Sequence, residues 1–507
     1  MNALELLGLI MLIVMIGVIF IGFPISFTLL FLAFVFGYFG LGDVVFSLAY
    51  FQTIGLMKEE LLAAVPLFIF MGFITEQAGL MERLFGALRM LLAPVRGALF
   101  LVVILTATIF AMATGIVGAA VTVLGIMAAP IMIKTGYDAK LAAGAITAGG
   151  TLGILIPPSV MLIVMGPVLG VSVADLYAAA FGPGFMLAGM YVAYLLVRSI
   201  INPKLGPPVP KEERVASIWL ILKEVFIGVV PLAALISATL GTILAGAATP
   251  TEAAGIGALG AMILAVIYRR FTLAGLRQAC LSTISTSSMV LFLAVTSNIF
   301  GAVFARLGTA NWVTEAMIAM SFGPIVMLSA VVILLFLLGW PFEWPAIILV
   351  FLPVFYPVIE ALKPQLGVSL GIPTEMVMVW FGALVAVVMQ TAYLSPPVAM
   401  SAYYLRQVVK DWSLGLIYKG MFQFMVIQCI AIVLIIAFPK IAIWFPLELQ
   451  ENRRNEVREQ VEDNAESLER DTMENMQQQS QESQEALEKS EEAKPPAAPD
   501  AGKASKQ

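Results

Sequence analysis

Two proline-containing stretches decide the fold: Gly149–Ser159, with the sequence GGTLGILIPPS, and Gln390–Pro397, with the sequence QTAYLSPP. Both lie inside long apolar runs, and both contain two consecutive prolines. A proline inside a helix removes a backbone donor and clashes with the preceding turn, so each run must be broken there. Carbonyls freed by a break are costly in hydrocarbon unless something binds them. Each stretch therefore predicts a broken helix whose exposed backbone groups need a partner.

An apolar run too long for a single span precedes each of these stretches. Residues 98–133 and 312–359 both exceed the roughly 20 residues that cross a bilayer. Because Lys and Arg concentrate in cytoplasmic loops, both ends of the first run are expected in the cytoplasm. The first run thus predicts a re-entrant hairpin with its tip at 113–120, and the second predicts one with its tip at 338–345. Five basic residues flank the first run: Arg83, Arg89, Arg96, Lys134 and Lys140.

The two hairpins and the two broken helices repeat in the same order. Gly115 and Pro157 are 42 positions apart, and Gly339 and Pro396 are 57 apart. The difference is close to the length of the polar insertion 361–374. With the first hairpin entering from the cytoplasm and the second from outside, the pattern predicts an inverted repeat, with ligands bound near the middle of the membrane. A packing kink explains one such motif, whereas a matched pair favours a binding site.

Composition limits the fold class and the chemistry. Of 507 residues, 60% are hydrophobic and 12% are charged, against roughly 25% charged in soluble proteins, and the mean hydropathy is +0.97. This indicates an all-α polytopic membrane protein. The chain has no histidine and only two cysteines, Cys280 and Cys429. These counts exclude histidine-ligated metals, a Ser–His–Asp triad and cysteine-based metal sites.

The breaks and tips supply the candidate binding groups. Unwound carbonyls and hydroxyls suit Na⁺, and the N-terminal ends of half-helices suit a carboxylate. A membrane Ser or Thr more often bonds its own i−4 carbonyl, so the hydroxyls alone are a weak signal. We expect Na⁺ at Thr114, Thr151, Thr391 and Ser395, with backbone carbonyls. The full set of candidate residues is Thr114, Gly115, Gly149, Gly150, Thr151, Pro157, Pro158, Ser159, Gly339, Glu343, Gln390, Thr391, Ser395, Pro396 and Pro397.

Two acidic residues in apolar surroundings have different interpretations. Glu252 follows Thr249 by three positions, with Pro250 between them, which is the pattern of a capping box at a helix start. Glu343 lies in the second hairpin tip, where a carboxylate is costly without a cation or a donor. We therefore expect a structural role for Glu252 and a functional role for Glu343.

The motifs together resemble the large membrane subunit of TRAP transporters, a DctM-like permease of the ion-transporter superfamily. GTLGILIPPS, TPTEAA and the late SPPV occur in the family's order, and the resemblance covers about residues 1–445. It implies Na⁺-coupled import of an organic acid across a bacterial inner membrane by an elevator movement. It also implies two partners, a small four-helix membrane subunit and a periplasmic substrate-binding protein.

The elevator expectation divides the chain into scaffold and transport parts. The tail from Glu448 onward has 16 acidic and 8 basic residues, and we expect it to be largely disordered. The expected parts are scaffold helices and an interfacial arm at 1–97, transport repeat 1 at 98–175, scaffold helices at 176–311 with a cytoplasmic loop at 198–223, transport repeat 2 at 312–410, a C-terminal helix at 411–447 and the acidic tail at 448–507.

Three other functions were weighed against this one. A stand-alone Na⁺/carboxylate symporter of the same superfamily would need no binding protein. An intramembrane enzyme is disfavoured because no catalytic set of residues is evident. A passive channel is disfavoured because two hairpins that meet at broken helices predict an occluded site rather than a continuous pore. No cofactor is expected, and Na⁺ is the expected coupling ion.

Overall fold

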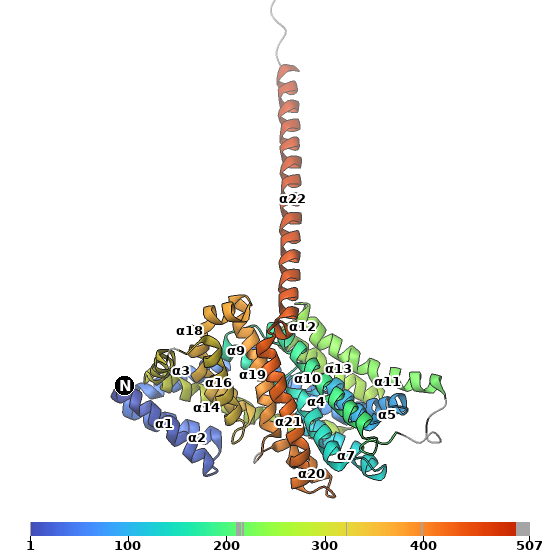
Figure 1. Ribbon diagram of the computed structural model, residues 1–507. Helices are drawn as coiled ribbons and strands as arrows, with labels where there is room; N and C mark the ends of the chain where they lie inside the picture. Colours follow the sequence, from blue (N-terminus) through green and yellow to red (C-terminus); the bar gives the residue numbers. More distant parts are fainter. Residues whose placement is uncertain (1, 209–213, 215–216, 321, 397–398, 493–507) are drawn as a thin grey trace, which may run out of the picture. The chain divides into compact units, whose positions relative to one another are not determined.

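The structure is helical throughout the part of the chain that it describes. The computed structural model describes residues 2–208, 214, 217–320, 322–396 and 399–492, and no strand occurs in them (Figure 1). Ten helices of these described residues are long and apolar enough to cross a membrane. The chain forms two units, Met1–Pro446 and Leu447–Gln507. The predicted class, an all-α polytopic membrane protein, is confirmed.

The first unit contains two groups of helices. One group consists of the helices outside the hairpins and broken helices, although Val173–Ile201 begins within the range predicted for repeat 1 and Thr309–Ala319 lies largely within 312–410, the range predicted for repeat 2. Its members are α1 (Ala3–Phe20), α2 (Ile25–Leu41), α3 (Val44–Met57), α4 (Ala64–Gln77), α5 (Leu80–Leu92), α10 (Val173–Ile201), α11 (Ile218–Ile236), α12 (Thr242–Leu244), α13 (Pro250–Ile267), α14 (Leu273–Arg306), α15 (Thr309–Ala319) and α21 (Leu414–Ala437).

The second group contains the hairpins and broken helices, and it confirms the predicted repeat. Each repeat has two hairpin arms followed by two half-helices. In the second repeat the short helix Trp344–Ala346 and the helix Leu352–Leu370 together form the second arm. The hairpin arms α6 and α16 have 17 and 15 residues, about 26 and 23 Å, which is short of the roughly 30 Å hydrocarbon core. The elements are α6 (Ala98–Thr114), α7 (Val117–Lys134), α8 (Ala139–Thr151) and α9 (Val160–Leu169), then α16 (Pro324–Leu338), α17 (Trp344–Ala346), α18 (Leu352–Leu370), α19 (Val377–Leu394) and α20 (Met400–Val408).

The first hairpin turns at a glycine. α6 ends at Thr114 because Gly115 adopts the left-handed conformation with φ of 63°, which glycine accepts at little cost. Ile116 is extended, with φ of −118° and ψ of 111°, and α7 begins at the next residue. Two residues therefore reverse the chain inside the predicted tip, 113–120.

The proline pairs break their helices as the sequence predicts. α8 ends at Thr151, a 3₁₀ turn follows at Leu152–Ile154, and α9 starts only at Val160, after the prolines. In the second repeat α19 ends at Leu394, and α20 starts at Met400. Both breaks leave helix ends in the interior of the protein, where their backbone groups can serve a ligand.

Segments that are distant in sequence pack side by side in this unit. α21 lies against α8, and α19 lies against α10. Glycines allow the closest approach: a Cβ added to Gly420 of α21 would lie 2.1 Å from the Lys140 carbonyl oxygen of α8. The broken helices are thus embedded among other helices rather than exposed to lipid, as irregular backbone in a membrane must be.

The start of α13 has the capping box that its sequence predicts. The Glu252 amide donates to the Thr249 hydroxyl at 3.2 Å, and the Glu252 carboxylate accepts from the Thr249 amide at 2.8 Å. Pro250 occupies the first helical turn, where its missing N–H is not needed. Glu252 is therefore a structural residue here.

Loss of this cap should be measurable as lost stability. Thr249→Ala removes the acceptor for an otherwise unpaired amide, and we expect it to lower the free energy of unfolding by about 1 kcal/mol. Thr53→Ala is the matched control, because the Thr53 hydroxyl only donates back to the Ala49 carbonyl within α3. Thermal unfolding in one detergent should separate the two variants. Equal unfolding temperatures would contradict the assigned role of the cap.

The tail differs from the sequence-based expectation. A single helix, α22 (Lys440–Glu492), runs through the segment that was expected to be largely disordered, and residues 493–507 lie outside the described part. Glu and Gln, the most frequent residues of the tail, have high helix propensity. The expectation gave more weight to the shortage of apolar residues than to this propensity.

Candidate functional site

One cavity brings the two repeats together. Its volume is about 210 Å³, and its lining includes both hairpin tips and both broken-helix regions. The first tip contributes Gly115–Gly118, and the second contributes Glu343–Pro345. Tyr393 comes from the end of α19 and Tyr404 from α20. The two tips therefore meet at one cavity, which is where an inverted repeat is expected to place its binding site.

Two helices outside the repeats complete the wall. α4 contributes Ile69, and α14 contributes Thr286, Met289 and Val290. The cavity therefore lies between the group of helices that forms the repeats and the group that does not. A ligand in this cavity would touch both groups at once.

The hairpin tips rest directly on other parts of the repeats. A Cβ added to Gly115 would lie 3.2 Å from the Pro158 carbonyl oxygen, so the first tip contacts the first break. A Cβ added to Gly339 would lie 3.2 Å from the Ala392 Cβ, so the second tip contacts the end of α19. These two predicted site residues are positions of close approach.

Two helices, the hairpin arm α7 and the half-helix α9, begin at this cavity. Val117 and Gly118 are the first residues of α7, and Val160 and Met161 are the first residues of α9. At the start of each helix, the side chain of the N-cap residue accepts no hydrogen bond from a backbone amide of the first turn. The first amides of both helices therefore have no capping partner of this kind, and the positive ends of both helix dipoles point to the same place.

The predicted hydroxyls are buried, and each donates its proton to the backbone. In the first repeat the Thr114 hydroxyl donates to the Phe110 carbonyl at 3.2 Å, and the Thr151 hydroxyl donates to the Ala148 carbonyl at 2.8 Å. In the second repeat Thr391 donates to Val388 at 2.6 Å. The oxygens keep lone pairs that can coordinate a cation. None of these three hydroxyls lines the cavity itself.

The two serines of the breaks behave in the same way. The Ser159 hydroxyl donates to the Ile154 carbonyl at 2.6 Å, across the proline pair. The Ser395 hydroxyl donates to the Thr391 carbonyl at 2.7 Å, and the Met425 Sδ lies 3.3 Å away. Both side chains are almost fully buried. They fix the local geometry of the breaks and lie behind the cavity.

Gly149 and Gly150 serve close helix packing. A Cβ on Gly149 would lie 3.2 Å from the Ala107 Cβ of α6, and a Cβ on Gly150 would lie 2.3 Å from a methyl carbon of Val121 in α7. The adjacent glycines thus let both arms of the first hairpin approach α8. A ligand role is not needed to explain them.

The remaining candidates have different surroundings. Pro157 and Pro158 are buried in the first break, and Pro396 is exposed in the second. Pro397 lies outside the described residues. Gln390 is fully buried in α19, and its amide oxygen accepts from the Gln428 side chain of α21 at 3.3 Å. Gln390 therefore points to α21 and not to the cavity.

Glu343 lines the cavity together with Tyr393 and Tyr404. It is close enough to Tyr393 and Tyr404 to interact with both electrostatically. Of the residues in the cavity wall, Glu343 and Gly115 were predicted from the sequence, whereas Trp344, Tyr393 and Tyr404 were not. Tyr393 and Trp344 stand beside predicted residues, whereas nothing in the sequence around Tyr404 distinguishes it from an ordinary helix residue.

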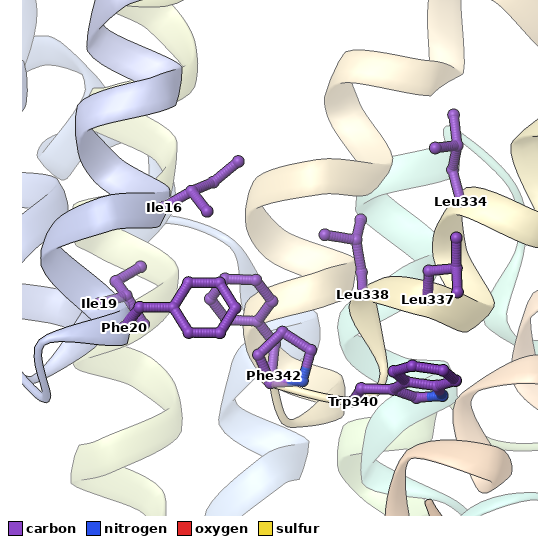
Figure 2. A pocket seen from close by; sticks show the side chains of 9 residues that line it. Ile16, Ile19, Phe20, Leu334, Leu337, Leu338, Trp340 and Phe342 are labelled. Carbon is purple, nitrogen blue, oxygen red and sulfur yellow. The ribbon is translucent and has the colours of Figure 1, made fainter.

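A second cavity lies on the outer side of the second hairpin tip. Its volume is about 560 Å³, and Figure 2 shows Phe20 of α1 beside Phe342 of the tip, with Trp340 farther from Phe20. The ring centroids of Phe20 and Phe342 are 6.4 Å apart. All nine lining residues are apolar, and several, such as Leu337, are exposed. Such a surface suits lipid chains and offers a polar substrate no partner.

Comparisons with known proteins agree with this arrangement. The family model described as the tripartite ATP-independent periplasmic transporter, DctM component, matches residues 12–441. The crystal structure of the YdaH transporter of Alcanivorax borkumensis, described as having an unusual topology, superposes with a TM-score of 0.54. It covers 80% of this chain and 90% of that one at 16% identity, which indicates a shared fold.

Curated relatives are transport permeases. The sialic acid TRAP transporter large permease protein SiaM of Vibrio cholerae is 28% identical over 435 residues, which cover 85% of this chain and 96% of that protein. The C4-dicarboxylate permease DctM of Rhodobacter capsulatus is 29% identical, with 70% and 80% covered. The ectoine permease TeaC of Halomonas elongata is 27% identical, with 86% and 98% covered. The chain therefore belongs to the DctM family of TRAP transporters, as a large permease subunit and a multi-pass protein of the bacterial inner membrane.

Proposed function

We propose that this subunit imports an organic acid, driven by Na⁺, and that the cavity between the two hairpin tips is the substrate site. The observation that carries the proposal is the convergence of both tips and both breaks on that cavity. We further propose that it acts with a small four-helix membrane subunit and a periplasmic substrate-binding protein, as TRAP large permease subunits do.

The cation would bind beside the cavity, at the breaks. Na⁺ needs several oxygen ligands, and backbone carbonyls with buried hydroxyls supply them. Thr114 and Thr151 would serve in the first repeat, and Thr391 and Ser395 in the second. Each hydroxyl already donates its proton to a carbonyl, so the lone pairs of its oxygen are left to coordinate a cation. Glu343 supplies negative charge near these sites, which favours cation occupancy.

The substrate carboxylate would bind at the starts of α7 and α9. Their first amides face the cavity without side-chain caps, and the helix dipoles favour an anion there. Bound Na⁺ would offset the charge of Glu343, so that the acid binds well only after the ion. Coupling follows, because each ligand raises the affinity for the other.

Transport would proceed as an elevator movement. The repeats, 98–175 and 312–410, would move as one body, while 1–97 and 176–311 would stay fixed. The cavity fits this division because its wall combines repeat residues with α4 and α14. Sliding along α4 and α14 would carry the closed site from one side of the membrane to the other.

Uptake into proteoliposomes tests this function. Labelled carboxylates would be offered with an inward Na⁺ gradient or an equal K⁺ gradient, with and without the small subunit and the binding protein. Accumulation that requires Na⁺ and both partners is the expected result. Uptake by this chain alone would support a stand-alone symporter, and uptake that is equal in K⁺ would contradict Na⁺ coupling.

Ser395 offers a specific test of the ion site. Ser395→Ala removes a proposed ligand, and we expect it to raise the half-saturating Na⁺ concentration about tenfold, which corresponds to about 1.4 kcal/mol. Ser329→Ala is the matched control, because Ser329 also donates to its i−4 carbonyl, at 2.8 Å, but lies in α16 away from the break. Na⁺ titration of uptake measures both variants. An unchanged Na⁺ requirement for Ser395→Ala would remove this residue from the site.

A further inference from the structure

The substrate cavity has a predominantly apolar wall. Ile69, Ile154, Val160 and Met289 approach it from four different elements of the chain. Three aromatic side chains, Trp344, Tyr393 and Tyr404, complete the wall beside the second tip. A ligand that fills this cavity would bury most of its surface against hydrocarbon and aromatic rings, so an apolar body is favoured.

The charge in the cavity limits the charge of the ligand. Among the lining residues described, Glu343 is the one charged side chain, and none is a lysine or arginine. The starts of α7 and α9 lie next to one another and can receive one carboxylate group. A second carboxylate would have no lysine or arginine to pair with and would face the apolar wall, or Glu343, whose charge the bound Na⁺ already balances, which is unfavourable. A single negative charge is therefore the best match.

The size and polarity of the cavity limit the ligand further. A volume of about 210 Å³ corresponds to roughly seven water molecules. Ligand pockets for drug-sized molecules are larger, about 300–1,000 Å³. The hydroxyl groups in the wall belong to Thr286, Tyr393 and Tyr404. An acid with many hydroxyls would lose its water and leave most of them unpaired.

We propose that this cavity selects a small monocarboxylic acid with an apolar or aromatic body, against dicarboxylic and polyhydroxylated acids. This rests on the proposed function of the same cavity. The relatives named for sialic acid, C4-dicarboxylates and ectoine have more polar ligands, so this selectivity would distinguish the present chain from them.

Direct binding to the membrane complex tests this selectivity without the contribution of the binding protein. The chain with its small subunit would be placed in nanodiscs, and Na⁺-dependent thermal stabilisation would be measured with phenylacetate, 4-methyl-2-oxopentanoate, succinate and gluconate. Phenylacetate and gluconate are both monoanions but differ in hydroxyl content, whereas succinate is a small dianion. We expect the first two acids to bind at least tenfold more tightly than the last two.

Substitutions in α20 test whether the preference for an aromatic monocarboxylate depends on the wall of the cavity. Tyr404→Ala should weaken phenylacetate binding at least tenfold, and Tyr404→Phe, which keeps the ring, should retain it. Tyr403→Ala is the matched control, because Tyr403 is exposed on the same helix and does not line the cavity. It should change the affinity by less than twofold.

The possible outcomes distinguish a failure of the proposed selectivity from a failure of the proposed function on which it rests. Na⁺-dependent binding of succinate or gluconate as tight as that of phenylacetate would overturn the selectivity and leave the proposed function standing. Unchanged phenylacetate binding in a folded Tyr404→Ala variant would also overturn it. If none of the four acids stabilises the complex in a Na⁺-dependent manner, and uptake is equally independent of Na⁺, the proposed function fails and this inference fails with it.

Discussion

Replacing Glu343 by glutamine should raise the Na⁺ concentration needed for half-maximal uptake by ten- to a hundredfold, a loss of about 1.4–2.7 kcal/mol in ion binding. The substitution preserves the shape of the side chain and removes its charge. Glu343 is the charged group in the wall of the cavity, beside the proposed cation sites. Without it, Na⁺ loses a favourable electrostatic partner in a medium of low dielectric constant, where such partners matter most.

Glu252→Gln is the matched control for this prediction. It makes the same chemical change in the same unit, but Glu252 belongs to the capping box of α13, and glutamine can fill that position too. The control should keep the wild-type Na⁺ requirement. Na⁺ titration of uptake under one membrane potential measures both variants. A Glu343→Gln variant with wild-type Na⁺ dependence would show that its carboxylate does not serve the ion.

Replacing Gly115 by alanine should abolish transport in a protein that still inserts into the membrane. The left-handed backbone of Gly115, with φ of 63°, costs an L-residue about 1–2 kcal/mol. The added Cβ would also lie 3.2 Å from the Pro158 carbonyl oxygen and would push the first tip away from the first break. The two halves of the proposed site would then no longer meet.

Gly371→Ala is the control that separates the free-energy cost of a left-handed backbone from the effect of disturbing the contact between the first tip and the first break. Gly371 has φ of 65°, nearly the same as Gly115, but an added Cβ would meet nothing within 4 Å. Both variants should lose similar stability in thermal unfolding, and only Gly115→Ala should lose uptake. If Gly371→Ala lost uptake equally, general destabilisation and not the tip contact would explain the effect.

Local signals account for the parts of the fold that were predicted. Paired prolines fix both helix breaks, because no helix continues through them. The pattern Thr249-Pro250-Thr251-Glu252 fixes the start of α13, because its hydrogen bonds form within four residues. The hairpins followed from apolar runs too long for one span and from the placement of basic residues.

The walls of the site depend on contacts that the sequence does not encode locally. Gly115 and Tyr404 lie almost 300 positions apart and line one cavity. Gln390 was expected among the binding groups, but its partner is Gln428 of a neighbouring helix. Gly149 and Gly150 read equally well as ligands or as packing residues until the neighbouring Ala107 and Val121 are known. Side-chain direction and helix packing decide these roles.

The central claim, that Na⁺ binds where the two hairpin tips meet, is tested most directly by thiol accessibility. In a background with Cys280→Ser and Cys429→Ser, Ile116→Cys places one thiol on the first tip, in the cavity wall. N-ethylmaleimide labelling rates would be measured on the complete membrane complex in Na⁺ and in equal K⁺. The native Cys280, exposed and outside the wall, serves as the control when Cys429→Ser is the sole replacement.

We expect Na⁺ to slow labelling of the Ile116→Cys thiol at least fivefold and to leave labelling of Cys280 unchanged. Adding Glu343→Gln should remove the protection at a given Na⁺ concentration and restore it only at a higher one. Equal labelling of the tip in Na⁺ and K⁺, with the control behaving normally, would contradict a Na⁺ site at the meeting point of the two hairpins.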